Sequence, residues 1–116
     1  LKEEDAAAVD AMEVLKMATV NGAYAMGLPD ADVLAKGKLA DMILIDLDQP
    51  NMRPFNNIAK NIVYSGSKIN VKLTMIGGKI LYENGVFQTS EDPAAIYERA
   101  EEIIKDKKQK ISKNVL

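Results

Sequence analysis

The chain has 116 residues, a formal net charge of -2, and neither cysteine nor histidine. Without cysteine it lacks disulfides, thiol nucleophiles and cysteine metal ligands, which is compatible with a cytoplasmic location. Without histidine it also lacks the imidazole ligands of zinc and iron sites and the usual base of a serine triad, so we expect no catalytic, metal-binding or cofactor-binding residue in it.

The beginning of the chain is predicted to be helical. Apolar residues recur at steps of three and four over Asp5–Ala18, with Asp5 as the expected N-cap. Thr19–Gly22 is expected to interrupt the helix before a second short helix, Ala23–Met26. Gly27 is expected to end that second helix as a C-terminal cap, and a turn follows.

A strand is predicted over Ala40–Leu47, where an apolar run lies between Asp41 and Asp46. Such a run is typical of a strand that is buried on both faces inside a sheet. Asp41 and Asp46 are five residues apart, which places their carboxylates on opposite faces and roughly 16 Å apart along the strand. We therefore interpret both as structural: Asp41 accepts backbone N–H bonds at a turn, and Asp46 caps the strand.

A short helix is predicted after the strand. Asn56 or Asn57 is expected to cap it, and it runs to about Tyr64 before Ser65-Gly66 closes it. We interpret Tyr64, and Tyr82 further along the chain, as half-buried packing residues rather than proton donors.

A three-stranded β-meander is predicted over residues 71–87. Val71–Ile76 alternates in the manner of a strand, and Gly77-Gly78 supplies the positive φ angles of a tight turn. Asn84-Gly85 makes the second turn, before the last short strand. We interpret the glycine pair as hairpin geometry and not as a phosphate-binding loop, because no helix N-terminus follows it.

The end of the chain is predicted to be an amphipathic helix that Asp92-Pro93 opens. Acidic residues gather in its first half and lysines in its second half, which matches the helix dipole. The lysines raise a nucleic-acid-binding alternative, which would require salt-sensitive binding that is lost when they are neutralised. No aromatic residues interleave with them and acids lie close by, so we expect no nucleic-acid partner.

Several segments, in chain order, resemble parts of the metal-dependent amidohydrolase family. They look like the paired helices that end its catalytic barrel, the turn and strand just after the barrel, and the closing hairpin. The residues that carry this resemblance are Val14–Thr19, Asn21–Ala23, Met26–Leu28, Gly37–Asp46, Ile76–Lys79 and Asn84–Gly85. Their order and spacing make the resemblance specific.

Within the family, the chain most resembles the branch that contains S-adenosylhomocysteine and 5'-methylthioadenosine deaminases, guanine deaminases and triazine chlorohydrolases. The adenosine-type deaminases are the nearest match. The residues concerned are Leu47–Pro50, Arg53-Pro54, Asn56 and Val63–Ser65.

The resemblance implies an α+β fragment of a larger enzyme. Residues 1–35 would be the terminal helices of a TIM-type α/β barrel, residues 36–90 part of a small composite β-sandwich, and residues 91–116 a C-terminal helix. The parent enzyme would deaminate an aminopurine nucleoside or a related ring, and the fragment alone would be inactive. The alternative is a stand-alone, non-enzymatic β-sandwich interaction module.

The resemblance also implies zinc or iron in the parent enzyme, where the metal lowers the pKa of a bound water that attacks the ring carbon carrying the amine. The family's ligands are a His-x-His pair, two further histidines and an aspartate, all upstream of the matched region. None is carried over to this chain, and neither Asp5 nor Asp10 takes the role of the aspartate. We expect no cofactor in the fragment itself.

The expected partners follow from the same resemblance. The sandwich of the family also takes strands from the N-terminal part of the enzyme, so we expect that missing part as a partner. The doubly apolar strand Met42–Leu47 motivates a further hypothesis, self-association into a homo-oligomer or a domain-swapped dimer. No apolar run approaches the ~20 residues of a membrane-spanning helix, so we expect no membrane partner.

Overall fold

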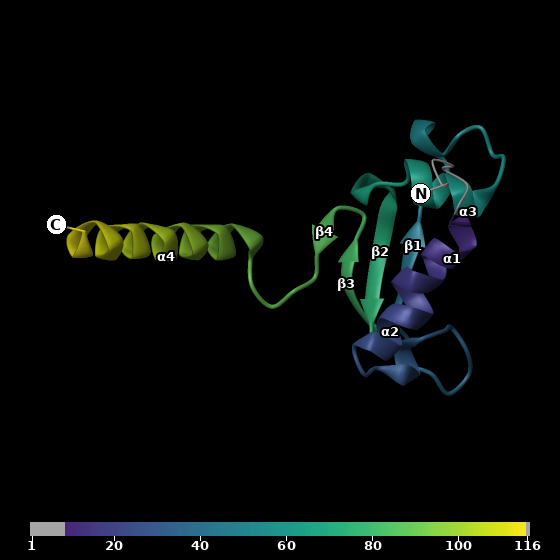
Figure 1. The fold of residues 1–116 in the computed structure, drawn as a ribbon, viewed down its shortest axis with the longest axis horizontal. Coiled ribbons are helices and arrows are strands. Elements are labelled where there is room, and N and C mark those ends of the chain that lie inside the picture. The colour runs from purple at the N-terminus through teal and green to yellow at the C-terminus, as the bar shows by residue number, and fades with distance from the viewer. Residues whose placement is uncertain (1–8, 116) are drawn as a thin grey trace, which may run out of the picture. The chain divides into compact units, whose positions relative to one another are not determined.

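A computed structural model of the chain describes residues 9–115. The chain divides into two compact units, one up to Val86 and one from Phe87 onward. Figure 1 shows the elements of both: a helical segment and a four-stranded sheet in the first unit, and one long helix in the second. The two units are described separately below.

The first helical segment is continuous. It consists of α1 (Ala11–Lys16), a π-helical turn (Met17–Asn21) and α2 (Gly22–Ala25). The expected interruption at Thr19–Gly22 is therefore wrong. Gly22 has helical angles, with φ -62, and an added Cβ would lie 3.2 Å from the carbonyl oxygen of Met17. A glycine at this position leaves room for the wider π turn, so here it continues the helix instead of ending it.

The two ends of this segment differ in how far they match the expectation. The expected N-cap Asp5 lies outside the described residues, and Asp10 is the residue that precedes α1 in an extended conformation. At the other end Gly27 has a φ of 71 and ends the helix, as predicted. Its N–H donates to the carbonyl of Tyr24, and the N–H of Leu28 donates to the carbonyl of Ala23. A short 3-10 turn, Pro29–Ala31, follows.

The sheet has the order β1-β2-β3-β4, with β1 (Met42–Ile45), β2 (Val71–Ile76), β3 (Lys79–Glu83) and β4 (Val86–Phe87). β2 pairs antiparallel with both β1 and β3. The predicted meander is confirmed. Both turn pairs have positive φ angles, 56 and 78 at Gly77-Gly78 and 47 and 86 at Asn84-Gly85, which is the geometry of tight two-residue hairpin turns.

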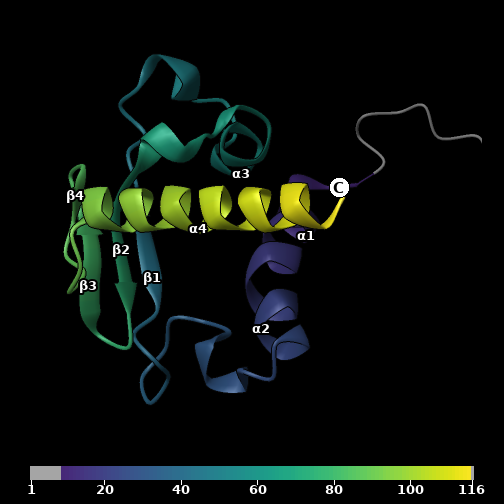
Figure 2. The ribbon, with the colours of Figure 1, turned by 90° about the vertical axis from the view of Figure 1, so that its left-hand side faces the viewer.

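β1 is less buried than its sequence predicts. Ile43 is 52% exposed and Leu44 is 54% exposed. Neighbouring residues of a strand point to opposite faces, so both faces of β1 are open within the described residues. The expectation of a doubly buried strand is therefore wrong, because the described residues leave side chains on both faces of β1 about half exposed. In the described sheet β1 is also an edge strand, paired with β2. Figures 1 and 2 show the helical segment α1–α2 alongside the sheet, on the side of β1.

The connection from β1 to β2 holds most of the small core. It contains a 3-10 turn (Pro50–Met52), α3 (Ile58–Lys60), a π-helical turn (Asn61–Ser65) and a second 3-10 turn (Lys68–Asn70). α1 and α3 are in contact. Among the described residues the buried ones are Ala11, Met52 and Asn70.

The short helix in this connection begins as predicted. Of the two candidate caps, Asn57 is the one observed, because its side-chain oxygen accepts from the N–H of Lys60 at 3.0 Å.

The second unit consists of the end of β4, a connecting segment and α4 (Pro93–Asn114). Asp92 is the N-cap: its carboxylate accepts from the N–H of Ala94 at 3.3 Å, and Pro93 occupies the first helical position. This start was predicted. Within the part of the chain that is described, no helix combines the length and the apolar character that crossing a membrane would require.

Candidate functional site

A paired set of amides lies where β1 ends and β2 begins. Asn70 is 1% exposed. Its side-chain nitrogen donates to the Asn51 side-chain oxygen at 3.1 Å, and the Asn51 nitrogen donates back to the Asn70 oxygen at 2.7 Å. These two side chains come from positions 19 apart in the sequence. The reciprocal pair therefore fixes the long connection to the start of β2.

Further hydrogen bonds satisfy the rest of Asn70. Its side-chain oxygen also accepts from the N–H of Ser67 at 3.0 Å, as part of a capping box over Ser67–Asn70. Its side-chain nitrogen donates to the carbonyl of Asp46 at 3.3 Å, and its backbone carbonyl accepts from the N–H of Asp46 at 2.6 Å. A buried amide with all these partners is a structural element that specifies one geometry.

Asp46 extends this network towards solvent. Its carboxylate accepts from the Gln49 side chain at 2.8 Å and from the N–H of Asp48 at 2.9 Å, and Lys72 lies 3.5 Å away. The Gln49 hydrogen bond first, then the Asp48 N–H and the Lys72 ammonium, hold the pKa of Asp46 below its usual value. Asp46 thus stays ionised and caps the strand end, as predicted.

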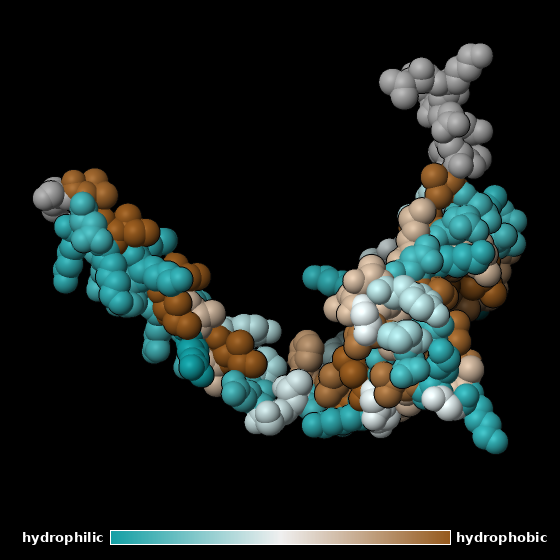
Figure 3. All heavy atoms as spheres, turned by 60° about the horizontal axis from the view of Figure 1, so that its bottom comes forward, coloured by the Kyte–Doolittle hydropathy of each residue, from teal (hydrophilic) through white to brown (hydrophobic). Residues whose placement is uncertain are grey.

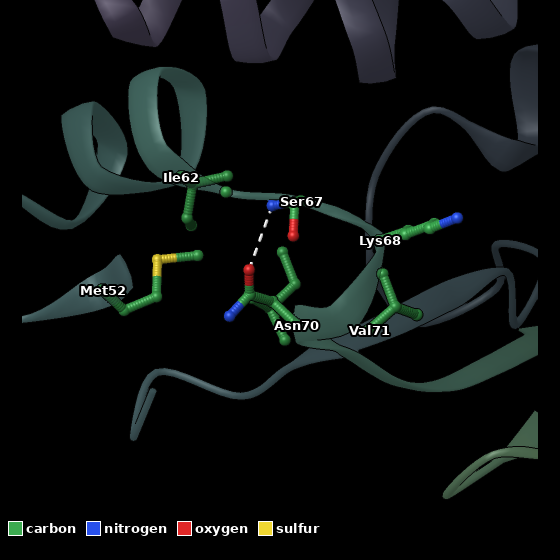
Figure 4. Close-up of a pocket in the computed structure, with 8 residues that line it drawn as sticks. Met52, Ile62, Ser67, Lys68, Asn70 and Val71 are labelled. Carbon is green, nitrogen blue, oxygen red and sulfur yellow. Dashed lines mark hydrogen bonds between the residues drawn. The ribbon is translucent and has the colours of Figure 1, made fainter. Parts of the chain in front are cut away.

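A small open pocket of about 230 Å³ lies beside the amide pair. Figure 4 shows Met52, Ile62 and Asn70 directed towards one another, while the Lys68 ammonium points away. The walls are mostly apolar, with Ile45 and Val71 completing them. Such a pocket can accept an apolar side chain, since the Asn70 amide beside it is already bonded within the protein.

A second charged pair fixes the loop after α2. Lys38 and Asp32 lie 3.0 Å apart, and the Asp32 side chain is only 11% exposed. The hydrogen bond from Lys38 lowers the pKa of Asp32, and the same bond raises the pKa of Lys38. Lys38 also donates to the carbonyl of Pro29 at 3.1 Å, so the pair closes the loop instead of facing a cleft.

The other residues weighed from the sequence take structural places. Asp41 accepts from the N–H of Gly77 at 2.7 Å, which confirms its predicted role at a turn. Gly77-Gly78 forms the hairpin turn. Tyr82 is half-buried in β3, as expected. Tyr64 is 60% exposed, so its prediction as a half-buried residue is wrong: the described residues leave most of its ring open to solvent.

The residues present do not fit the metal that the family resemblance implies. Residues 9–115 contain no group of three or more His, Cys, Asp or Glu side chains that could hold a metal ion, and the whole sequence has no histidine. Zinc and iron sites in proteins rely on imidazole or thiolate ligands. The Asn51–Asn70 pair was not found from the sequence, although the Ser67-x-x-Asn70 spacing before a strand was a local signal for its capping box.

Comparison with known proteins places this geometry in a family. The family model of the amidohydrolases matches residues 1–81. The chain belongs to the amidohydrolase family. The predicted resemblance is confirmed, and these matches do not favour the alternative of a stand-alone module.

Individual amidohydrolases agree with the predicted branch. The chain is 44% identical over 77 residues to the 5-methylthioadenosine/S-adenosylhomocysteine deaminase of Thermococcus onnurineus, covering 66% of this chain and 18% of that protein. An adenosine deaminase from Xanthomonas campestris with bound zinc superposes with a TM-score of 0.77 and 29% identity, over 84% of this chain and 22% of that one. Atrazine chlorohydrolase from Arthrobacter aurescens TC1, complexed with zinc, gives a TM-score of 0.72 and 29% identity, over 81% and 20%.

This amidohydrolase chain spans about a fifth of the length of the curated relatives it matches. The two solved structures each cover more than four fifths of the chain.

Proposed function

We propose that this chain is the C-terminal part of a larger metal-dependent amidohydrolase, and that the whole enzyme removes the amino group of an aminopurine nucleoside by hydrolysis. The observation that carries the proposal is the 44% identity to a 5-methylthioadenosine/S-adenosylhomocysteine deaminase of which the chain spans 18%. The proposed substrates are 5'-methylthioadenosine, S-adenosylhomocysteine or a close analogue, and the proposed location is the cytoplasm.

In this proposal the chain supports the enzyme and takes no part in the reaction. Zinc or iron belongs to the preceding part of the enzyme, since the present sequence has no histidine to ligate it. Residues 1–35 contribute the last barrel helices, residues 36–90 part of a composite β-sandwich, and residues 91–116 the C-terminal helix. We assign no catalytic, metal-binding or cofactor-binding residue within them.

The edge strand supports the composite sandwich. Among the described residues β1 pairs with β2 only, and the apolar side chains of Ile43 and Leu44 are exposed on opposite faces. An open apolar strand edge is normally covered or paired in a stable protein. We propose that strands and helices from the N-terminal part of the same enzyme cover β1.

An activity comparison tests the proposal. The 116-residue chain and the longest reading frame that contains it are purified separately. Ammonia release from 5'-methylthioadenosine and S-adenosylhomocysteine is measured for both, together with their zinc and iron content. We expect turnover and bound metal in the longer protein and neither in the short chain. Turnover by the short chain with stoichiometric metal would refute the proposal, as would a longer protein without a His-x-His pair.

One substitution tests the covering of β1. Ile43→Lys should change the unfolding free energy of the short chain by less than about 0.5 kcal/mol, because the site is already exposed. In the longer enzyme it should cost about 2 kcal/mol or more, since the side chain would then be buried. Lys79→Ala, at the exposed start of β3, is the control. Equal effects of Ile43→Lys in both proteins would contradict the proposed cover.

A further inference from the structure

α4 carries an apolar stripe that its own unit does not bury. Tyr97, Ile104 and Ile111 recur every seven residues, and Ile96 and Ile103 lie next to them. These five side chains are between 45% and 64% exposed. Figure 3 shows apolar side chains in a row along the helix, beside hydrophilic ones. Most helices in water depend on packing of such a face, so this 22-residue helix calls for a partner.

The seven-residue spacing defines a coiled-coil seam. With Tyr97, Ile104 and Ile111 at the a positions, the d positions are Ala100, Lys107 and Asn114. The positions flanking the seam then include Glu101 and Lys108, both e positions. The seam is short, about 33 Å over 22 residues.

The charges decide how two such helices can pair. In a parallel pair each d residue faces its own copy, which sets Lys107 against Lys107 in the seam. In an antiparallel pair a faces d, so Lys107 meets Ile104 and can lay its methylene stem on it while the ammonium reaches water. The antiparallel register also sets Ala100 against Ile111, a small residue against a large one.

The flanking charges agree with the antiparallel arrangement. In this register e faces e, so Glu101 of one helix faces Lys108 of the other, and twofold symmetry repeats the pair. More broadly, the acidic first half of α4 lies against the lysine-rich second half of its partner. The helix is therefore complementary to a second copy of itself in the reversed direction.

We infer that α4 is a homodimerisation helix, which pairs antiparallel with α4 of a second copy of this chain through Ile104, Ile111 and Ala100, with Glu101–Lys108 ion pairs on one flank. The assignment goes beyond the proposed deaminase function. It also places self-association on α4 and not on the strand Met42–Leu47 that first suggested it.

Charge substitutions in the full chain test the pairing. Glu101→Lys should raise the dimer dissociation constant about 10-fold at low salt, because two attractive pairs become repulsive. Glu102→Lys makes the same change of net charge at a position away from the seam and should leave the constant nearly unchanged. Glu101→Lys combined with Lys108→Glu should restore the original constant. Sedimentation equilibrium measures all four proteins.

Disulfide trapping tests the direction, since the chain has no cysteine of its own. In the antiparallel pair Ala100→Cys faces the partner's position 111, so a mixture of Ala100→Cys and Ile111→Cys should cross-link between the two variants. Ala100→Cys alone should not cross-link, because the two copies of that position lie about 16 Å apart along the axis.

Four results would overturn the inference. The first is a monomer at the highest concentration reached, which would indicate that another part of the same enzyme covers the apolar stripe of α4. The second is equal weakening by Glu101→Lys and Glu102→Lys, and the third is the absence of rescue in the charge-swapped variant. The fourth is efficient cross-linking of Ala100→Cys with itself, which would indicate a parallel pair.

Discussion

Replacing Asn70 by alanine should destabilise the first unit more than any surface substitution. The side chain is 1% exposed and makes four side-chain hydrogen bonds, two with Asn51 and one each with Ser67 and Asp46. At about 1 kcal/mol for each bond the loss could reach ~4 kcal/mol. Ser67 is exposed and Asn51 is half-buried, so in the variant water can replace some of the lost hydrogen bonds to these two residues. We expect a loss of about 3 kcal/mol.

Urea unfolding followed by circular dichroism measures this loss, at one protein concentration for all variants because self-association would shift the transition. Asn56→Ala is the matched control: Asn56 is exposed, and its replacement should change the unfolding free energy by less than about 0.5 kcal/mol. A loss for Asn70→Ala of under about 1 kcal/mol, or one equal to that of the control, would show that the amide pair does not hold the connection.

A second variant at the same position separates hydrogen bonding from volume. Asn70→Asp keeps the shape but presents an oxygen where Asn70 donates to the Asp46 carbonyl and the Asn51 oxygen. Burial and these oxygens raise its folded-state pKa above the usual value for aspartate. Relative to the wild type, the variant should therefore gain stability as the pH falls and lose it as the pH rises through the folded-state pKa. A penalty independent of pH would contradict this account.

Three further predictions concern the turns and the strand end. Asp41→Ala should cost about 1 kcal/mol in urea unfolding, because it removes the acceptor of the Gly77 N–H. The pKa of Asp46 is lowered from its ordinary value of 3.8, so its contribution to stability is lost as the pH falls below that value. Asp46→Asn should therefore reduce the loss of stability below pH 3.8. Unfolding curves with the same pH dependence in both proteins would contradict this. Gly66 has a φ of -62, which any residue can adopt, but an added Cβ would overlap the carbonyl oxygen of Ile62. Gly66→Ala should therefore cost about 2 kcal/mol of unfolding free energy. An unchanged thermal unfolding curve would refute the overlap.

The features predicted correctly from the sequence are those that neighbouring residues determine. Gly77-Gly78 and Asn84-Gly85 have positive φ angles, and Asp92-Pro93 opens α4. In each case the residue type itself selects the backbone conformation, whatever surrounds it. The role of Asp41 was also predicted, because a carboxylate beside a turn has few other partners.

The features that were missed depend on distant residues. Whether Gly22 ends or continues a helix depends on the space around the Met17 carbonyl. The Asn51–Asn70 pair joins positions 19 apart, and the local capping-box spacing at Asn70 says nothing about its partner Asn51. The exposure of β1 was missed because an apolar run gives the same sequence signal whether it is covered by this polypeptide or by another one.

The two exposed apolar surfaces call for different kinds of partner. β1 shows uncharged side chains on both faces and an unpaired edge, so its cover must supply backbone hydrogen bonds as well as apolar contact. The cover proposed for β1 would complete the fold, and we expect it to be lost only on unfolding. The stripe on α4 belongs to a helix whose backbone bonds are already made within the element, and acids and lysines flank it. Its contact can therefore form and dissociate between folded molecules and weaken with salt. As the ionic strength rises, the proposed α4 dimer should dissociate, while the unfolding free energy of the sheet should hardly change. This result would assign the two surfaces to separate partners.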